Sequence, residues 1–249
     1  LLMVIAVIGL TGCNNGGDEK VVKTDAIKFK EEYESINGEE LYGKKARELT
    51  IPEKNPFVYA TADEIVEMMD NDETFAVYFG FNTCPWCRAA VSTLIDVAND
   101  LGLKKIYYVD VKEIRNVLEV VDGEVTTKKE GSKGYMKLLK KLDNVLDEYE
   151  LKDEDGKEVD TKMKRIYAPN IVSIVDGEAQ KMTTATSDDL ENPYDELTDK
   201  IIAESSENSE IKDTALMQKM ELTKLTEQEL MLESLIKAYG YDEVVVTMS

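Results

Sequence analysis

A continuous apolar segment followed at once by two closely spaced cysteines is the feature that most constrains this sequence. Residues 75–81 read Phe-Ala-Val-Tyr-Phe-Gly-Phe, and Cys84-Pro85-Trp86-Cys87 comes directly after them. A run of this length and composition is typical of a strand buried on both faces. Apolar residues then recur at helical spacing from Pro85 until Gly102, a residue that commonly ends helices. The cysteine pair is therefore predicted to lie where a buried strand passes into a helix.

Short strands and helices alternate on both sides of this junction, which predicts an α/β fold. Two further strands are expected at residues 57–59 and 106–109, and Thr61 is expected to begin a helix between the first of them and the buried strand. The Asp176-Gly177 pair lies between two strand-like segments and is a strong hairpin signal. These elements together predict a central mixed sheet that is flanked by helices.

The segment from about 112 to 165 interrupts this alternation and is predicted to be a helical insertion. Its apolar residues recur at helical spacing and face several lysines: Tyr135, Leu138, Leu139, Leu142, Val145, Leu146 and Tyr149. Asp153 to Lys157 is interpreted as a hairpin turn. Its acidic residues do not have the spacing of an EF-hand calcium loop.

Composition excludes several classes of chemistry and leaves the cysteines as the main candidates. The chain has no histidine, which rules out a Ser-His-Asp triad, a Cys-His pair and any metal site that needs histidine. It also lacks a glycine-rich phosphate loop, so no nucleotide cofactor is indicated. Its 51 acidic and 30 basic residues give a formal charge of −21, which disfavours binding to nucleic acid.

The spacing of Cys84 and Cys87 suits thiol chemistry at the start of a helix. Cys84 would lie at the N-cap, where unpaired amides and the helix dipole stabilise a thiolate. Pro85 fits the first turn because its missing N–H costs nothing there. Cys87, three residues on, can meet disulfide geometry. A static disulfide and two packed thiols remain alternatives, whereas a zinc site would lack ligands.

Residues from about 56 to 202 resemble the thioredoxin superfamily. The segment from Phe79 to Arg88 matches the active-site motif of that superfamily, and Tyr167-Ala168-Pro169 resembles its cis-proline loop. The resemblance implies a thioredoxin-like fold in which Cys84 attacks, Cys87 resolves, and Ala168 and Pro169 hold a substrate chain. It implies no metal and no cofactor other than a redox-active disulfide between the two cysteines.

Three neighbouring side chains are expected to support this site. Tyr78 occupies the position at which thioredoxins carry a buried acid, and a phenol there would stay protonated at neutral pH. Trp86 would shield the disulfide or offer a flat surface to an unfolded substrate. Arg88 could favour the thiolates, although an exposed, solvated arginine is the expectation.

The N-terminal residues resemble a lipoprotein signal. An apolar run, Leu1 to Leu10, precedes Thr11-Gly12-Cys13, and Leu10 to Cys13 is similar to a bacterial lipobox in which the cysteine is lipidated. The alternative is a buried cysteine in a short apolar helix. The lipobox implies an extracytoplasmic protein anchored by lipid to the cell membrane.

The expected organisation has four parts. Residues 1–13 form the signal peptide with the lipidation cysteine, 14–26 a tether, 27–205 the thioredoxin-like domain, and 206–249 a helical tail without an assigned role. A helix is expected to start at Asn192-Pro193, and another after a capping box formed by Thr226 and Glu229.

These features together predict a membrane-anchored thiol-disulfide oxidoreductase. It would exchange disulfides with exported proteins or peptides, and a membrane redox partner would recycle it. The combination is similar to Gram-positive lipoproteins related to bacteriocin transport accessory proteins. Two alternatives remain at this point: a non-catalytic binding module for an exported peptide, and a Cu(I) carrier that uses the two thiolates.

Overall fold

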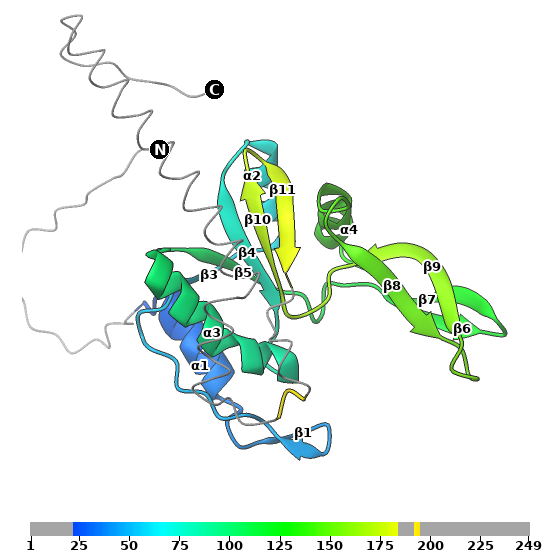
Figure 1. Cartoon of the computed structure of the whole chain (residues 1–249), viewed down its shortest axis with the longest axis horizontal. Helices are drawn as coiled ribbons and strands as arrows, with labels where there is room; N and C mark the ends of the chain where they lie inside the picture. The colour runs from blue at the N-terminus through cyan, green and yellow to red at the C-terminus, as the bar shows by residue number, and fades with distance from the viewer. Residues whose placement is uncertain (1–21, 184–191, 195–249) are drawn as a thin grey trace, which may run out of the picture.

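The computed structural model describes residues 22–183 and 192–194, and a five-stranded mixed sheet lies at its centre (Figure 1). The strand order is β11-β10-β4-β5-β3. The bounds are β3 Phe57–Tyr59, β4 Phe75–Gly80, β5 Ile106–Asp110, β10 Asn170–Val175 and β11 Glu178–Thr183. Strands β3, β4 and β5 run parallel, whereas β10 is antiparallel to β4 and to β11. The predicted central mixed sheet is confirmed.

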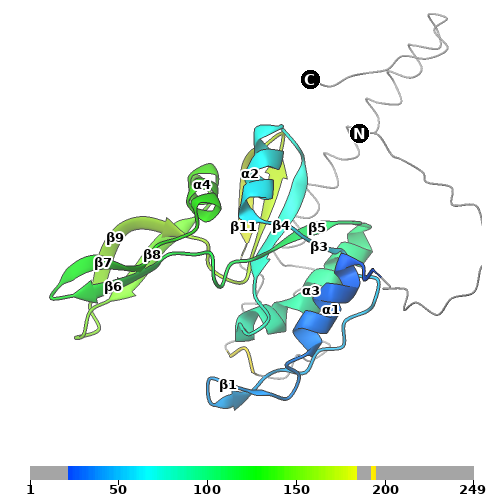
Figure 2. The same ribbon diagram turned by 180° about the vertical axis from the view of Figure 1, so that it is seen from behind.

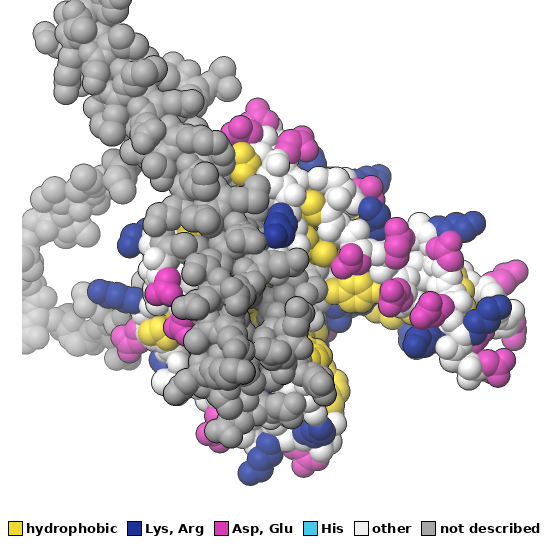
Figure 3. All heavy atoms as spheres, in the orientation of Figure 1, with side chains coloured by type: hydrophobic (Ala, Val, Ile, Leu, Met, Phe, Trp, Pro, Cys, Tyr) yellow, Lys and Arg dark blue, Asp and Glu magenta, His cyan; other side chains and the backbone are white. Residues whose placement is uncertain are grey.

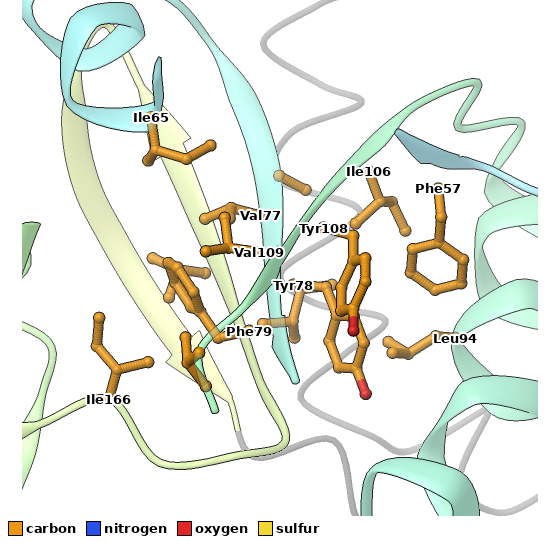
Figure 4. Packing of buried hydrophobic residues seen from close by; sticks show 14 of the residues in the cluster. Phe57, Ile65, Val77, Tyr78, Phe79, Leu94, Ile106, Tyr108, Val109 and Ile166 are labelled. Atoms are coloured by element: carbon orange, nitrogen blue, oxygen red, sulfur yellow. The ribbon is translucent and has the colours of Figure 1, made fainter. Parts of the chain in front are cut away.

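Helices cover both faces of this sheet. Helices α1 (Asp25–Glu34) and α3 (Pro85–Leu101) lie side by side on one face, and α2 (Ala62–Asp70) covers the other, as Figures 1 and 2 both show. The pattern of residues along β4 explains this arrangement, because all six of them are buried. Tyr78 points toward the α3 side with Tyr108 of β5, whereas Val77 points toward α2 (Figure 4).

Local signals in the sequence account for the ends of several elements. Thr61 caps α2 by accepting a hydrogen bond from the Glu64 amide at 3.2 Å, and the Glu64 carboxylate accepts one from the Thr61 amide at 2.7 Å. Gly102 ends α3 with a φ of 69°. Asp176 and Gly177 both have positive φ, 48° and 74°, as the predicted tight hairpin requires.

The segment between α1 and β3 forms a small hairpin and a long connection. The hairpin consists of β1 (Glu40–Leu41) and β2 (Lys44–Lys45). The Asn37 side chain braces the connection, because it donates to the Leu49 carbonyl at 2.8 Å and accepts from the Leu49 amide at 2.9 Å.

The prediction of a helical insertion is wrong, because most of this segment forms β-hairpins. Its elements are β6 Val117–Val121, β7 Glu124–Lys129, α4 Lys133–Lys141, β8 Asp147–Lys152 and β9 Glu158–Arg165. The helix ends at its C-cap, Leu142, and a turn follows in which the Val145 amide bonds to the Leu142 carbonyl at 3.0 Å. Tyr149 lies in β8, where its ring packs 4.0 Å from the Arg165 guanidinium.

Two turn signals mark these hairpins. Asp122 and Gly123 have φ of 53° and 80° between β6 and β7, and this Asp-Gly pair could have revealed the hairpin. The Asp153 carboxylate accepts from the amides of Asp155 and Lys157 at 3.1 and 2.8 Å, so the predicted turn there is confirmed. The two hairpins project from the sheet as an arm on which acidic and basic side chains are interspersed (Figure 3).

Several predictions concern residues outside the described ranges. They are the lipobox with Cys13, the tether up to residue 21, the helix after Tyr194 and the tail with Thr226 and Glu229. Among the described residues, no helix has the length and apolar character needed to cross a membrane.

Candidate functional site

Cys84 lies at the N-cap of α3, where the sequence predicts it. Its backbone is extended, with φ −79° and ψ 119°, and its Sγ accepts a hydrogen bond from the Cys87 amide at 3.2 Å. Pro85 occupies the first turn of the helix. The Cys84 side chain is 6% exposed, and the neighbouring Pro85 and Trp86 are half-buried.

The two thiols have different electrostatic environments. A hydrogen bond from the Cys87 thiol lowers the pKa of Cys84, and the backbone amides of Cys87 and Trp86 act in the same direction. Burial raises the pKa of Cys87 well above its ordinary value. Both cysteines are free thiols, so the expected disulfide between them is not present. Cys84 is the thiol that ionises first.

The loop before β10 completes this site. The Ala168–Pro169 peptide bond is cis, and the Cys84 thiol donates to the Ala168 carbonyl across 3.5 Å. The loop is positioned by the pairing of Asn170 with Phe79 at the end of β4. The fold thus brings Cys84, Cys87, Ala168 and Pro169 together from segments far apart in the sequence.

Arg88 is buried, which corrects the expectation of a solvated side chain. It is 1% exposed, and its guanidinium donates to main-chain carbonyls and to one side-chain amide rather than to a carboxylate. The acceptors are the carbonyls of Arg47, Tyr33 and Asn82 and the Asn37 Oδ1. Arg88 therefore connects α3 to α1 and to the connection after α1.

Tyr78 is fully buried beside Cys87 and begins a column of tyrosine rings. Its ring stacks on that of Tyr108 with centroids 5.8 Å apart, and Figure 4 shows both hydroxyl groups on the α3 side of the sheet. Burial raises the pKa of Tyr78 well above its usual value, and the charge of Cys87 adds to this effect. The phenol therefore stays protonated, as the sequence predicts.

Glu32 of α1 ends this column and was not among the residues predicted for the site. Its carboxylate accepts hydrogen bonds from the Tyr108 hydroxyl, at 3.0 Å, and from the Tyr59 hydroxyl. Burial raises the pKa of Glu32, and the nearby Asp110 adds to the shift. No signal in the sequence singles out Glu32 from the other acids of its helix.

Replacing Glu32 with glutamine should weaken the pH dependence of stability. Because the folded pKa of Glu32 is raised, the unfolding free energy falls as pH rises from the unfolded pKa through the folded one. Glutamine removes this charge and still offers one acceptor and one donor to Tyr59 and Tyr108. The unfolding free energy of the full chain, measured by urea unfolding between about pH 4 and 8, should therefore fall less steeply with pH for Glu32→Gln than for the unchanged protein. An unchanged slope would contradict the assignment, and the exposed Glu31→Gln serves as the control.

A family model matches a little under half of the chain. Residues 126–249 match the model of a family described as SpoIIIAH-like protein. The match includes Ala168 and Pro169 and begins after Cys84 and Cys87. It extends through residues 184–191 and 195–249, which lie outside the described ranges. No curated protein matches the chain.

This match corrects the functional interpretation made from the cysteine motif. The matching family is a family of sporulation proteins. The assignment to thioredoxin-superfamily lipoproteins, the relation to bacteriocin transport accessory proteins and the oxidoreductase activity are therefore wrong. Over residues 126–249 the chain is similar to the SpoIIIAH-like sporulation proteins.

Proposed function

We propose that the chain is a non-enzymatic, sporulation-related protein whose described residues bind an extended polypeptide segment of a partner. The binding site would be the surface around Cys84, which we call the Cys84 surface and define by Cys84, Pro85, Trp86, Tyr167 and Ala168. The family match supports the non-enzymatic, sporulation-related role. The geometry of the Cys84 surface supports the binding role.

The main support for the proposal is the contact between Cys84 and Ala168 at a half-buried, largely apolar surface. Cys84 Sγ lies 3.5 Å from the Ala168 carbonyl. The side chains of Pro85, Trp86, Tyr167 and Ala168 are all half-buried. Tyr167 and Ala168 lie outside any strand, directly before β10. Extended, proline-rich peptides commonly dock against surfaces lined by aromatic side chains, and Trp86 and Tyr167 provide two such side chains here.

We also propose a thioredoxin-like fold for the domain. Three parallel strands, an antiparallel hairpin at one edge and helices on both faces support this arrangement. The position of the Ala168–Pro169 loop next to an N-cap cysteine supports it further. The fold is separate from the activity, because one fold serves many unrelated functions.

The proposed partner is an exported polypeptide. The lipobox-like residues Leu10 to Cys13 support a position outside the cell membrane, with Cys13 as the lipid anchor. Binding by the Cys84 surface requires no metal or cofactor. Within the described ranges, no three Cys, Asp or Glu side chains come together as metal ligands would.

Trp86 gives a direct test, because it is the only tryptophan of the chain. We expect its fluorescence to change in a saturable way when cysteine-free peptides about a dozen residues long, with apolar centres, are titrated into the full chain. Ala168→Glu should weaken binding at least about tenfold, because it places a charge against the bound peptide. Val121→Glu, at an exposed position of β6, should bind like the unchanged protein.

The same titration separates binding from thiol chemistry. Cys87→Ser, which removes the second thiol and with it any disulfide of the pair, should keep its affinity within about twofold, because Cys87 is fully buried and is not part of the Cys84 surface. If peptides bind equally well to the unchanged protein and to Ala168→Glu, the Cys84 surface is not the binding site. If no peptide of the set binds to the unchanged protein or to any variant, the proposed function fails.

A further inference from the structure

A short segment from the C-terminal part of the chain lies against the start of α3. We call Asn192, Pro193 and Tyr194 the strap. The Arg47 guanidinium donates two hydrogen bonds to the Pro193 carbonyl, at 2.9 and 3.3 Å. The Lys44 ammonium lies 4.8 Å from the centre of the Tyr194 ring. The strap is thus held by residues almost 150 positions earlier in the sequence.

The strap forms one wall of a groove that borders the Cys84 surface. The groove is lined by Leu41, Ala46, Arg47, Pro85 and Arg88, and Pro193 and Tyr194 complete its wall. Pro85 belongs both to this groove and to the Cys84 surface. Figure 1 shows the strap beside the first turn of α3 and close to β1. A polypeptide that covers Pro85 would therefore meet the strap.

The contacts that hold the strap suit reversible attachment. Among the described residues they include one carbonyl shared by two donors and one cation placed over a ring, and all three strap residues are half-buried. Partly exposed contacts of this kind contribute little individually, because water competes for each group. The strap is therefore poised to detach from Arg47 and Lys44 without unfolding the sheet.

We propose that the strap competes with the bound polypeptide for the Pro85 side of the Cys84 surface. This inference rests on the proposed function, whose binding surface it regulates. The apparent affinity for the polypeptide then depends on the fraction of molecules in which the strap has left the groove. Anything that draws the strap away would increase binding, and anything that fixes it would decrease binding.

The proposal is tested by variants that loosen the strap from each side. Tyr194→Ala removes the ring that Lys44 contacts. Arg47→Met removes both donors to Pro193 but keeps the Arg47 carbonyl that Arg88 uses. We expect each variant to bind the peptides of the Trp86 titration about fivefold more tightly. Lys45→Ala, an exposed change in the same hairpin, should leave the affinity unchanged.

A second measurement separates this inference from the proposed function. Hydrogen exchange at the amide of Tyr194 should be faster in Arg47→Met than in the unchanged protein, and peptide should accelerate it in the unchanged protein. If the unchanged protein binds peptide and neither variant binds more tightly, the competition is refuted. If binding occurs only in the loosened variants, both proposals gain support. If no variant binds, the proposed function fails and the competition fails with it, even where exchange confirms a seated strap.

Discussion

Replacing Arg88 with methionine is expected to lower the free energy of unfolding by about 4 kcal/mol, one of the two largest effects we predict. The guanidinium donates to the Tyr33 carbonyl at 2.6 Å, the Arg47 carbonyl at 2.9 Å and the Asn37 Oδ1 at 2.7 Å. Methionine fills similar space but leaves the Tyr33 and Arg47 carbonyls without this donor, whereas Asn37 Oδ1 keeps only the Leu49 amide. Helix α3 would lose its hydrogen bonds to α1 and to the connection after α1.

Urea unfolding of the full chain, followed by circular dichroism, measures this loss. Arg88→Lys should also be strongly destabilising, because one ammonium group cannot reach acceptors spread around a planar guanidinium. Arg115→Met is the matched control. Arg115 is half-exposed and lies 5.1 Å from the Phe81 ring, so its loss should cost less than about 1 kcal/mol. A similar loss for Arg88→Met and Arg115→Met would refute the anchoring role.

Gly177→Ala is expected to destabilise the fold by about 3 kcal/mol or more. Gly177 has a φ of 74°, and a Cβ at this position would lie 2.2 Å from the Met69 carbonyl oxygen of α2. Backbone atoms on both sides would have to move. The hydrogen bond from the Gly177 amide to the Glu73 carbonyl, 3.1 Å, would be lost or distorted by that movement.

The chain contains a matched control for this change. Gly123 follows an aspartate in the same kind of hairpin turn, with a φ of 80°, and a Cβ there would meet nothing within 4 Å. Gly123→Ala should therefore cost only the left-handed backbone term, about 1 kcal/mol. Thermal unfolding of the two variants compares them directly. Equal losses of stability in Gly177→Ala and Gly123→Ala would show that the contact of residue 177 with α2 does not contribute to the destabilisation.

The sequence predicts the junction of β4 and α3 well because the signals there are local. An apolar run, a proline in the first turn and a glycine at the end act over a few neighbouring residues. The insertion could not be predicted in this way. The residues 138, 142, 145 and 149 recur at helical spacing, yet Tyr149 is placed by its contact with Arg165 on the paired strand. Pairing between strands overrides local periodicity.

The candidate site shows the same division between local and distant causes. Cys84 is placed by the helix it begins, so its position follows from the motif. The burial of Arg88 depends on carbonyls of Tyr33 and Arg47, which only the folded chain brings together. The function was harder to predict than the site, because the prediction was based on the cysteine motif at residues 84–87. The family match lies in residues 126–249, which do not include that motif.

The partners of Arg88 also bear on which changes the fold tolerates. Three of its four acceptors are main-chain carbonyls, which every amino acid carries. The side chains at positions 33, 47 and 82 can therefore vary without removing these hydrogen bonds. Chain length cannot vary as freely, since one inserted or deleted residue between positions 37 and 47 would move the Arg47 carbonyl away from the guanidinium. Homologous chains that keep this arginine should differ in residue type along this connection much more than in its length.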